Sequence, residues 1–180
     1  MVLELHEVDP TPEPDNSTIY TAATPPETVI TDDLPGDHRP ATPTIASSIP
    51  CPSSTFIIRS VATSHVLTLL GGAVILASPG GPGNIHWQCV EAKGWLGFRD
   101  PCSGKYLGHN VKGNLVCDAG GHEGWERFCI RAVPEGGFVM LMTHWERLWG
   151  VAVWVEEGVR KLRKAGDGAS EGEVWEFVKV

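Results

Sequence analysis

A threefold repeat in the last 128 residues constrains the fold of this 180-residue chain more than any other feature of its sequence. Each repeat closes with a similar stretch that begins with tryptophan, and the three stretches read Trp87-Gln-Cys-Val, Trp125-Glu-Arg-Phe and Trp175-Glu-Phe-Val. Upstream of each tryptophan, two apolar anchors stand nine residues apart: Ile58 and Leu67, Phe98 and Leu107, Met140 and Trp149. A chain that repeats its apolar anchors in this way builds one structural unit three times.

Each unit consists of short apolar runs rich in Val, Ile, Phe and Trp, separated by Gly, Pro, Asn or Asp. This pattern is typical of strands and turns, so we expect four strands in each of three units at about 53–93, 94–133 and 134–180. Three units are fewer than the four to eight blades of a β-propeller, and a closed barrel capped by hairpins suits them better. The sequence therefore predicts an all-β fold, a β-trefoil, whose core contains the six anchors and the three repeat-closing tryptophans.

The third unit departs from the repeat. Its closing tryptophan follows the previous one by 50 residues, whereas the first interval is 38, and we expect the additional dozen residues to form a surface excursion through 151–158. Two off-register tryptophans in or beside predicted turns and a basic hairpin make this unit the predicted binding surface. The candidate binding residues are Trp145, Trp154, Arg160, Lys161, Arg163 and Lys164.

Residues 1–52 differ from the rest in composition. They hold nine acidic side chains against Arg39 alone, together with repeated Pro and Thr, so we expect a disordered acidic tail. Residues 53–180 hold 13 acidic and 13 basic side chains, which gives no net field to attract nucleic acid. Without a signal peptide or an apolar run long enough for a membrane span, we expect a monomeric cytoplasmic protein.

Five Cys and His side chains fall within 28 residues of the second unit. They are Cys102, His109, Cys117, His122 and Cys129. Their gaps of 7, 8, 5 and 7 residues differ from the two-to-four-residue pairs that structural zinc sites use, so we expect no metal. The sequence also lacks phosphate-loop, dinucleotide and nucleophile-elbow motifs, and we expect no cofactor.

One segment resembles the repeat of fascin-like β-trefoil domains. It runs from Phe98-Arg-Asp-Pro-Cys-Ser-Gly-Lys-Tyr-Leu-Gly through Asn114-Leu-Val-Cys117, with an apolar-basic pair, Gly-basic-Tyr-Leu and a Gly-Asn turn. The first and third units match this pattern loosely. The resemblance implies a β-trefoil over 53–180 and suggests actin as a partner. Ricin-type lectin trefoils are a weaker resemblance, since their Gln-x-Trp motif corresponds here to Glu123-Gly-Trp125 and Glu173-Val-Trp175.

Three functions follow from these observations. The leading hypothesis is a non-catalytic intracellular module that binds a protein or an anionic polymer through its enlarged third unit. The second is a small enzyme that acts on a hydrophobic metabolite in a Trp-lined barrel mouth, with His109 or His144 as acid/base catalyst. The third is a carbohydrate-binding, lectin-like trefoil.

Overall fold

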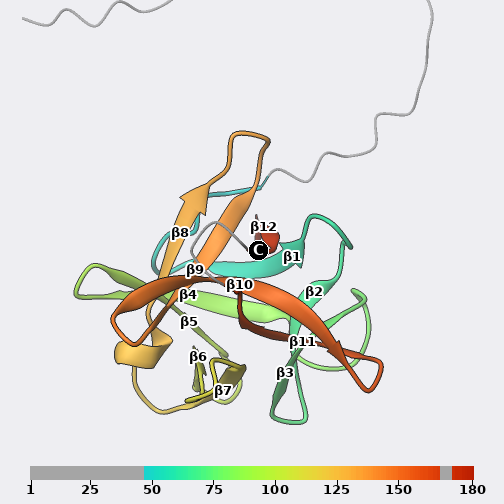
Figure 1. Cartoon of the computed structure of the whole chain (residues 1–180), viewed down its shortest axis with the longest axis horizontal. Coiled ribbons are helices and arrows are strands. Elements are labelled where there is room, and N and C mark those ends of the chain that lie inside the picture. The colour runs from blue at the N-terminus through green and yellow to red at the C-terminus, as the bar shows by residue number, and fades with distance from the viewer. Residues whose placement is uncertain (1–46, 167–171) are drawn as a thin grey trace, which may run out of the picture. The chain divides into compact units, whose positions relative to one another are not determined.

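The computed structural model describes residues 47–166 and 172–180, which form twelve β-strands and one short 3-10 helix (Figure 1). The first unit contains β1 (Thr55–Ser60), β2 (Val66–Leu70), β3 (Ala73–Ala77) and β4 (His86–Ala92). The second contains β5 (Trp95–Arg99), β6 (Tyr106–His109), β7 (Leu115–Ala119), η1 (Gly124–Glu126) and β8 (Phe128–Ala132). The third contains β9 (Phe138–His144), β10 (Arg147–Glu156), β11 (Val159–Lys164) and β12 (Val174–Lys179). The predicted all-β class and four strands per unit are confirmed.

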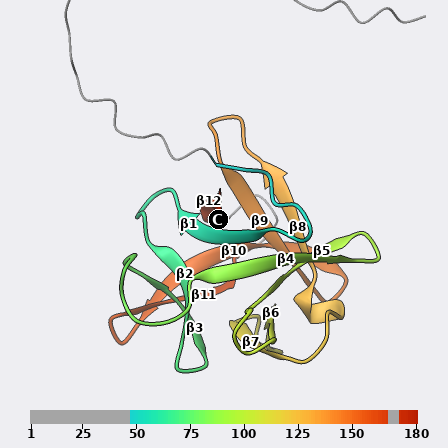
Figure 2. The same ribbon diagram turned by 180° about the vertical axis from the view of Figure 1, so that it is seen from behind.

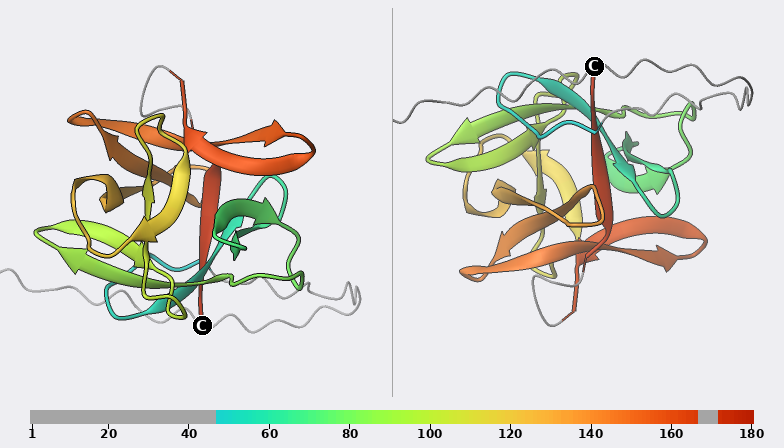
Figure 3. Two further views of the ribbon diagram at one scale, coloured as in Figure 1. Left: turned by 90° about the horizontal axis from the view of Figure 1, so that it is seen from below. Right: turned by 90° about the horizontal axis from the view of Figure 1, so that it is seen from above.

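Antiparallel pairing closes six strands into a barrel, in the order β1, β4, β5, β8, β9, β12 and back to β1. Each unit therefore gives its first and last strands to the barrel. Its two middle strands form a hairpin, so β2–β3, β6–β7 and β10–β11 make a second layer that can be followed from below in Figure 3. Figure 2 shows β4 and β5 from behind. Closure leaves the barrel with no unpaired sheet edge.

The apolar anchors meet inside this barrel. Five of the six anchors and two of the repeat-closing tryptophans have no exposed surface: Ile58, Leu67, Phe98, Leu107, Met140, Trp87 and Trp175. Burial of a side chain of this size contributes about 2–3 kcal/mol to folding, so the repeated anchors supply the core that the sequence predicts.

Two tryptophans that we predicted in the core are not core residues. Trp125 is 42% exposed and lies in η1, because β8 begins three residues later at Phe128, which takes the buried position. Trp149 is half-buried, while Val151, two residues further along β10, is fully buried. The threefold repeat of tryptophans in the sequence is therefore only approximate in the fold.

Residues 151–158, which we predicted to form a surface loop, belong mostly to a strand. Residues up to Glu156 belong to β10, which pairs with β11 from Val151 opposite Lys164 to Glu156 opposite Val159. The additional residues of the third unit thus lengthen a hairpin, because the run Val151-Ala-Val-Trp-Val155 is rich in the β-branched and aromatic side chains that suit a strand. Trp154, predicted in or beside a turn, lies within this strand and is half-buried.

The segment before β1 contacts the barrel. The Ser48 amide donates to the Phe177 carbonyl at 2.8 Å, and the Phe177 amide donates to Ser47 Oγ at 3.2 Å, so contacts with the barrel begin before the predicted boundary at 53. Disorder was predicted for residues 1–52, of which residues 1–46 lie outside the described residues. Over the described part of the chain, no helix has the length and apolar character that crossing a membrane requires.

Candidate ligand-binding site

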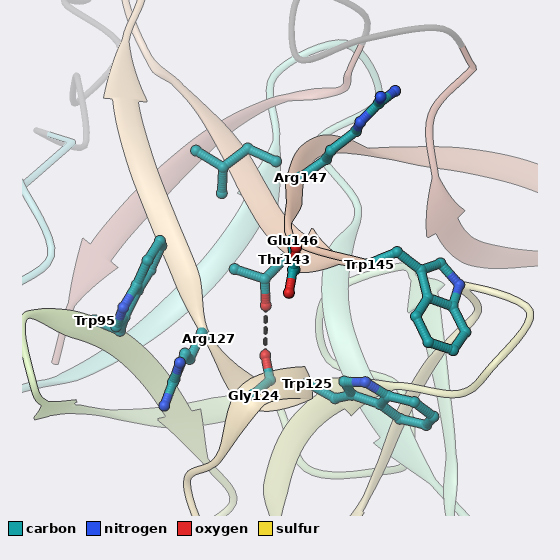
Figure 4. A pocket seen from close by; sticks show the side chains of 9 residues that line it. Trp95, Gly124, Trp125, Arg127, Thr143, Trp145, Glu146 and Arg147 are labelled. Carbon is teal, nitrogen blue, oxygen red and sulfur yellow. Dashed lines mark hydrogen bonds between the residues drawn. The ribbon is translucent and has the colours of Figure 1, made fainter.

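An open pocket of about 360 Å3 lies between β5, η1 and the turn that joins β9 to β10. Figure 4 shows Trp95 on one side and Trp125 with Trp145 on the other, with Thr143 and Glu146 between them. The pocket is lined by Trp95, Gly124, Trp125, Arg127, Thr143, Trp145, Glu146, Arg147 and Leu148. It therefore combines three indole side chains with several polar groups.

The short helix η1 presents Trp125 to the pocket. Glu123 and Glu126 form a reciprocal capping box, in which the Glu123 amide donates to Glu126 Oε2 at 3.1 Å. The hydroxyl of Thr143 on β9 donates to the Gly124 carbonyl, as Figure 4 shows. A capping box satisfies backbone donors that a helix end leaves free, so this single turn holds its shape. Trp125 is fixed at its backbone while its side chain stays exposed.

Trp145 enters the pocket from a strained turn. His144 pairs with Arg147, so Trp145 and Glu146 form the whole loop of a two-residue hairpin. Their φ angles are 49° and 60°, in the left-handed region that the type I′ turn requires at both central positions. Each non-glycine residue held there costs about 1–2 kcal/mol. The side chain of Trp145 is nevertheless 67% exposed, so its burial offsets little of this cost.

The other two-residue hairpin loops of the described residues show how the chain usually meets this requirement. They also have positive φ at both central positions, and each has glycine at the second: Gly71-Gly72, Lys93-Gly94 and Glu157-Gly158. The loop of Trp145 and Glu146 has no glycine. This turn therefore carries two strained residues, where each of the Lys93-Gly94 and Glu157-Gly158 turns carries one, and strained residues of this kind cluster at functional sites.

Two buried histidines pack against the exposed tryptophans Trp125 and Trp145. The His109 ring stacks on Trp125 with centroids 5.2 Å apart, and the His144 ring meets Trp145 edge to face at 5.7 Å. The two imidazoles are 5.0 Å apart. Burial lowers the pKa of His144 below 6.5, with the charges of Lys164 and His109 acting in the same direction. The Nε2–H of His144 donates to the Val111 carbonyl at 3.2 Å, which opposes this lowering of the pKa without cancelling it.

Free polar groups complete the pocket. Among the described residues, Arg127, Glu146 and Arg147 have no side-chain hydrogen bond or ion pair. Figure 4 shows Arg127 beside Trp95 and Arg147 pointing away from the centre. Guanidinium and carboxylate groups offer charge-assisted hydrogen bonds, so Arg127 and Glu146 are available to donate to and accept from a polar ligand.

The six predicted binding residues lie in different parts of the surface. Trp145 lines the aromatic pocket, whereas Trp154, Arg163 and Lys164 line a second groove at the β10–β11 hairpin. Lys161 forms an ion pair with Glu156 at 2.5 Å, and Arg160 is exposed and lines neither. The six residues do not form one surface.

The two histidines that we predicted as alternative catalytic residues are buried behind the tryptophans of the pocket. His109 and His144 are 2% and 4% exposed, and neither lines the aromatic pocket or the second groove. Burial raises the pKa of the Cys117 thiol to about 11, so this group is not a thiolate near neutral pH. Within the described residues, no three His, Cys, Asp or Glu side chains are arranged to hold a metal ion.

Sequence reasoning missed Trp95, Trp125, Arg127 and Glu146 as pocket residues. One signal in the sequence points to the site: the hairpin His144-Trp-Glu-Arg147 lacks the glycine or asparagine that such a tight turn favours. Trp125 was assigned to the core because it aligns with two tryptophans that are buried. Its true position depends on η1, which the repeat does not encode.

No family model and no curated protein matches this sequence. Among solved structures, the chain is similar to a ricin B-like lectin from Macrolepiota procera in complex with lactose, with 15% identity over 74% of this chain and all of that one, at a TM-score of 0.55. It is also similar to the designed threefold symmetric protein ThreeFoil, with 16% identity over 70% of this chain and 99% of that one, at a TM-score of 0.53.

A third similar structure is an endo-β-galactosidase from Clostridium perfringens that releases GlcNAcα1-4Gal, with 16% identity and a TM-score of 0.56. The match covers 71% of this chain but only 32% of the enzyme. At these identities the likeness concerns the fold, and it confirms a trefoil-like all-β architecture. The fascin-like resemblance and the actin partner stay predictions.

Proposed function

We propose that this protein is a carbohydrate-binding module and that the aromatic pocket holds the sugar. The observation that carries the proposal is the exposed Trp145, kept in a strained turn beside Trp125 and opposite Trp95. The contact of Trp145 with His144 offsets only part of the cost of this turn, because most of the Trp145 side chain stays exposed. The chain does gain a rigid aromatic surface on which a ligand can pack.

The chemistry of the pocket suits a pyranose. One face of such a ring carries C–H groups, which pack against an indole face, while its rim carries hydroxyls that need donors and acceptors. Arg127 supplies donors and Glu146 supplies acceptors at the edge of the same pocket. The pocket is open, which leaves room for further sugars of a longer glycan. The lactose complex of the structurally similar lectin makes β-galactosides the first ligands to test.

A glycan array with the full-length chain tests the proposal. We expect binding to a subset of glycans, and we expect Trp145→Ala to abolish it, because truncating a central aromatic residue costs a binding surface about 2 kcal/mol or more. Trp154→Ala is the matched control, since it also truncates a tryptophan of the third unit but lies outside the pocket. Absence of binding to every glycan, or equal loss in both variants, would refute the proposal.

A further inference from the structure

A second groove lies where the β6–β7 turn meets the β10–β11 hairpin. It has a volume of about 630 Å3, within the range of ligand sites, and is lined by Lys112, Asn114, Ala152, Val153, Trp154, Glu156, Arg163, Lys164, Ala165 and Gly166. None of the residues that line the aromatic pocket lines this groove. It is therefore a separate place on the barrel.

The two sides of the groove are joined by the backbone. The Lys164 amide donates to the Gly113 carbonyl at 2.8 Å, and Asn114 forms an isolated bridge with Arg163. Gly113 has a φ of 80°, and a Cβ there would lie 2.8 Å from Cγ and Cδ of Lys164, so the lysine stem crosses the turn at close approach. Lys112 is thus held near Arg163 and Lys164, although about fifty residues separate them in the sequence.

Two tryptophans hold the basic groups. Arg163 Cζ lies 4.7 Å from the centroid of the Trp154 ring, and Lys164 Nζ lies 4.6 Å from that of Trp149. A guanidinium that stacks by its face keeps the N–H groups of its edge free to donate. The aromatic rings therefore fix these cations without neutralising them.

The groove also carries a net positive charge. Within the described residues, Lys112, Arg163 and Lys164 form no ion pair. The carboxylate of Glu156 is already paired with Lys161 at 2.5 Å. Three uncompensated cations at one groove match an anion with several oxygens, such as a sulfate or a carboxylate.

We propose that this groove binds the sulfate or carboxylate groups of an acidic polysaccharide. Arg163, held over the Trp154 ring, offers N–H donors to one oxyanion, Lys112 faces it as a point charge, Lys164 adds its charge from beside Trp149, and the Asn114 amide offers neutral hydrogen bonds to hydroxyls. The charge is local, because the 53–180 region as a whole is balanced, so recognition depends on the anions that reach this groove. The site is independent of sugar binding at the aromatic pocket.

The test is calorimetric titration of the full-length chain with a heparin octasaccharide and with an octamer of galacturonate. We expect Arg163→Gln and Lys112→Gln each to weaken binding about tenfold, since each removes a charged donor. The salt dependence of binding should fall by about one unit of slope for each cation removed. Arg160→Gln is the matched control, with the same charge change on the same strand outside the groove, and its affinity should equal that of the wild type.

Several results would overturn the proposal. They are equal losses in Arg160→Gln and Arg163→Gln, tighter binding of a DNA duplex of equal charge, and inorganic sulfate that binds as tightly as either octasaccharide. Unfolding midpoints of all variants exclude a general loss of structure. Trp145→Ala should leave octasaccharide binding intact, so failure of the aromatic-pocket proposal and failure of this one give different results.

Discussion

Replacement of Glu146 by glycine should stabilise this protein and weaken its sugar binding together. Glu146 is the second central residue of the β9–β10 turn, with a φ of 60°, and its side chain is exposed and unpaired among the described residues. Glycine adopts this conformation without the steric cost that a Cβ brings. The carboxylate that the pocket offers to a ligand is lost at the same time.

The magnitude follows from the turn itself. Relief of one left-handed residue gains about 1–2 kcal/mol, and the greater freedom of glycine in the unfolded chain returns about half of that. We expect a net gain of about 0.5–1 kcal/mol, which raises the unfolding midpoint by about 2–5 °C for a domain of this size. Loss of a charged hydrogen bond to the sugar weakens binding about tenfold.

Glu157→Gly is the matched control. Glu157 also sits at a central position of a two-residue turn, with a φ of 51°, but at the far end of β10 and outside the pocket. Urea denaturation and titration with the glycan that the array selects measure both effects. We expect both variants to gain stability and only Glu146→Gly to lose affinity. If Glu146→Gly were less stable than the wild type, the claim of a strained turn would be wrong.

Two further predictions concern the residues that support the fold. Burial lowers the pKa of His144, so this side chain binds more protons in the unfolded chain than in the folded one below pH 6.5. Its contribution to stability is therefore complete above pH 6.5 and falls as the pH drops below that value. Melting temperatures between pH 8 and 5 should decline less steeply in His144→Phe than in the wild type, and equal slopes would contradict this. Asp100→Ala should lower the free energy of unfolding by about 2 kcal/mol, because the buried carboxylate accepts hydrogen bonds from Ser103 and Asn84. Asp118→Ala, at an exposed position of β7, is the control, and equal effects in urea denaturation would refute a special role for Asp100.

The fold could be predicted from the sequence because it depends on repeated apolar anchors. Ile58, Phe98 and Met140 occupy equivalent barrel positions, and burial at such positions leaves a periodic trace in the sequence. Each unit also alternates strands with turn residues, which is a local property. Four strands per unit therefore followed without a structure.

The candidate site could be predicted only in part, because it depends on departures from the repeat. Trp145 was found, since it stands out of register and in a turn. Trp125 was not, because one short helix moves it by three residues relative to the buried position that Phe128 takes. The meeting of Lys112 with Arg163 depends on packing between two units, which no local pattern in the sequence records.

The most direct test of the aromatic pocket as a sugar site is an NMR titration that follows the indole N–H signals of the tryptophans. The chain has seven tryptophans, and single substitutions assign their signals. With lactose or the glycan that the array selects, we expect shifts for the pocket residues Trp95, Trp125 and Trp145 and none for the buried Trp87 and Trp175. Shifts confined to Trp154, or none at any glycan concentration, would contradict the proposed function.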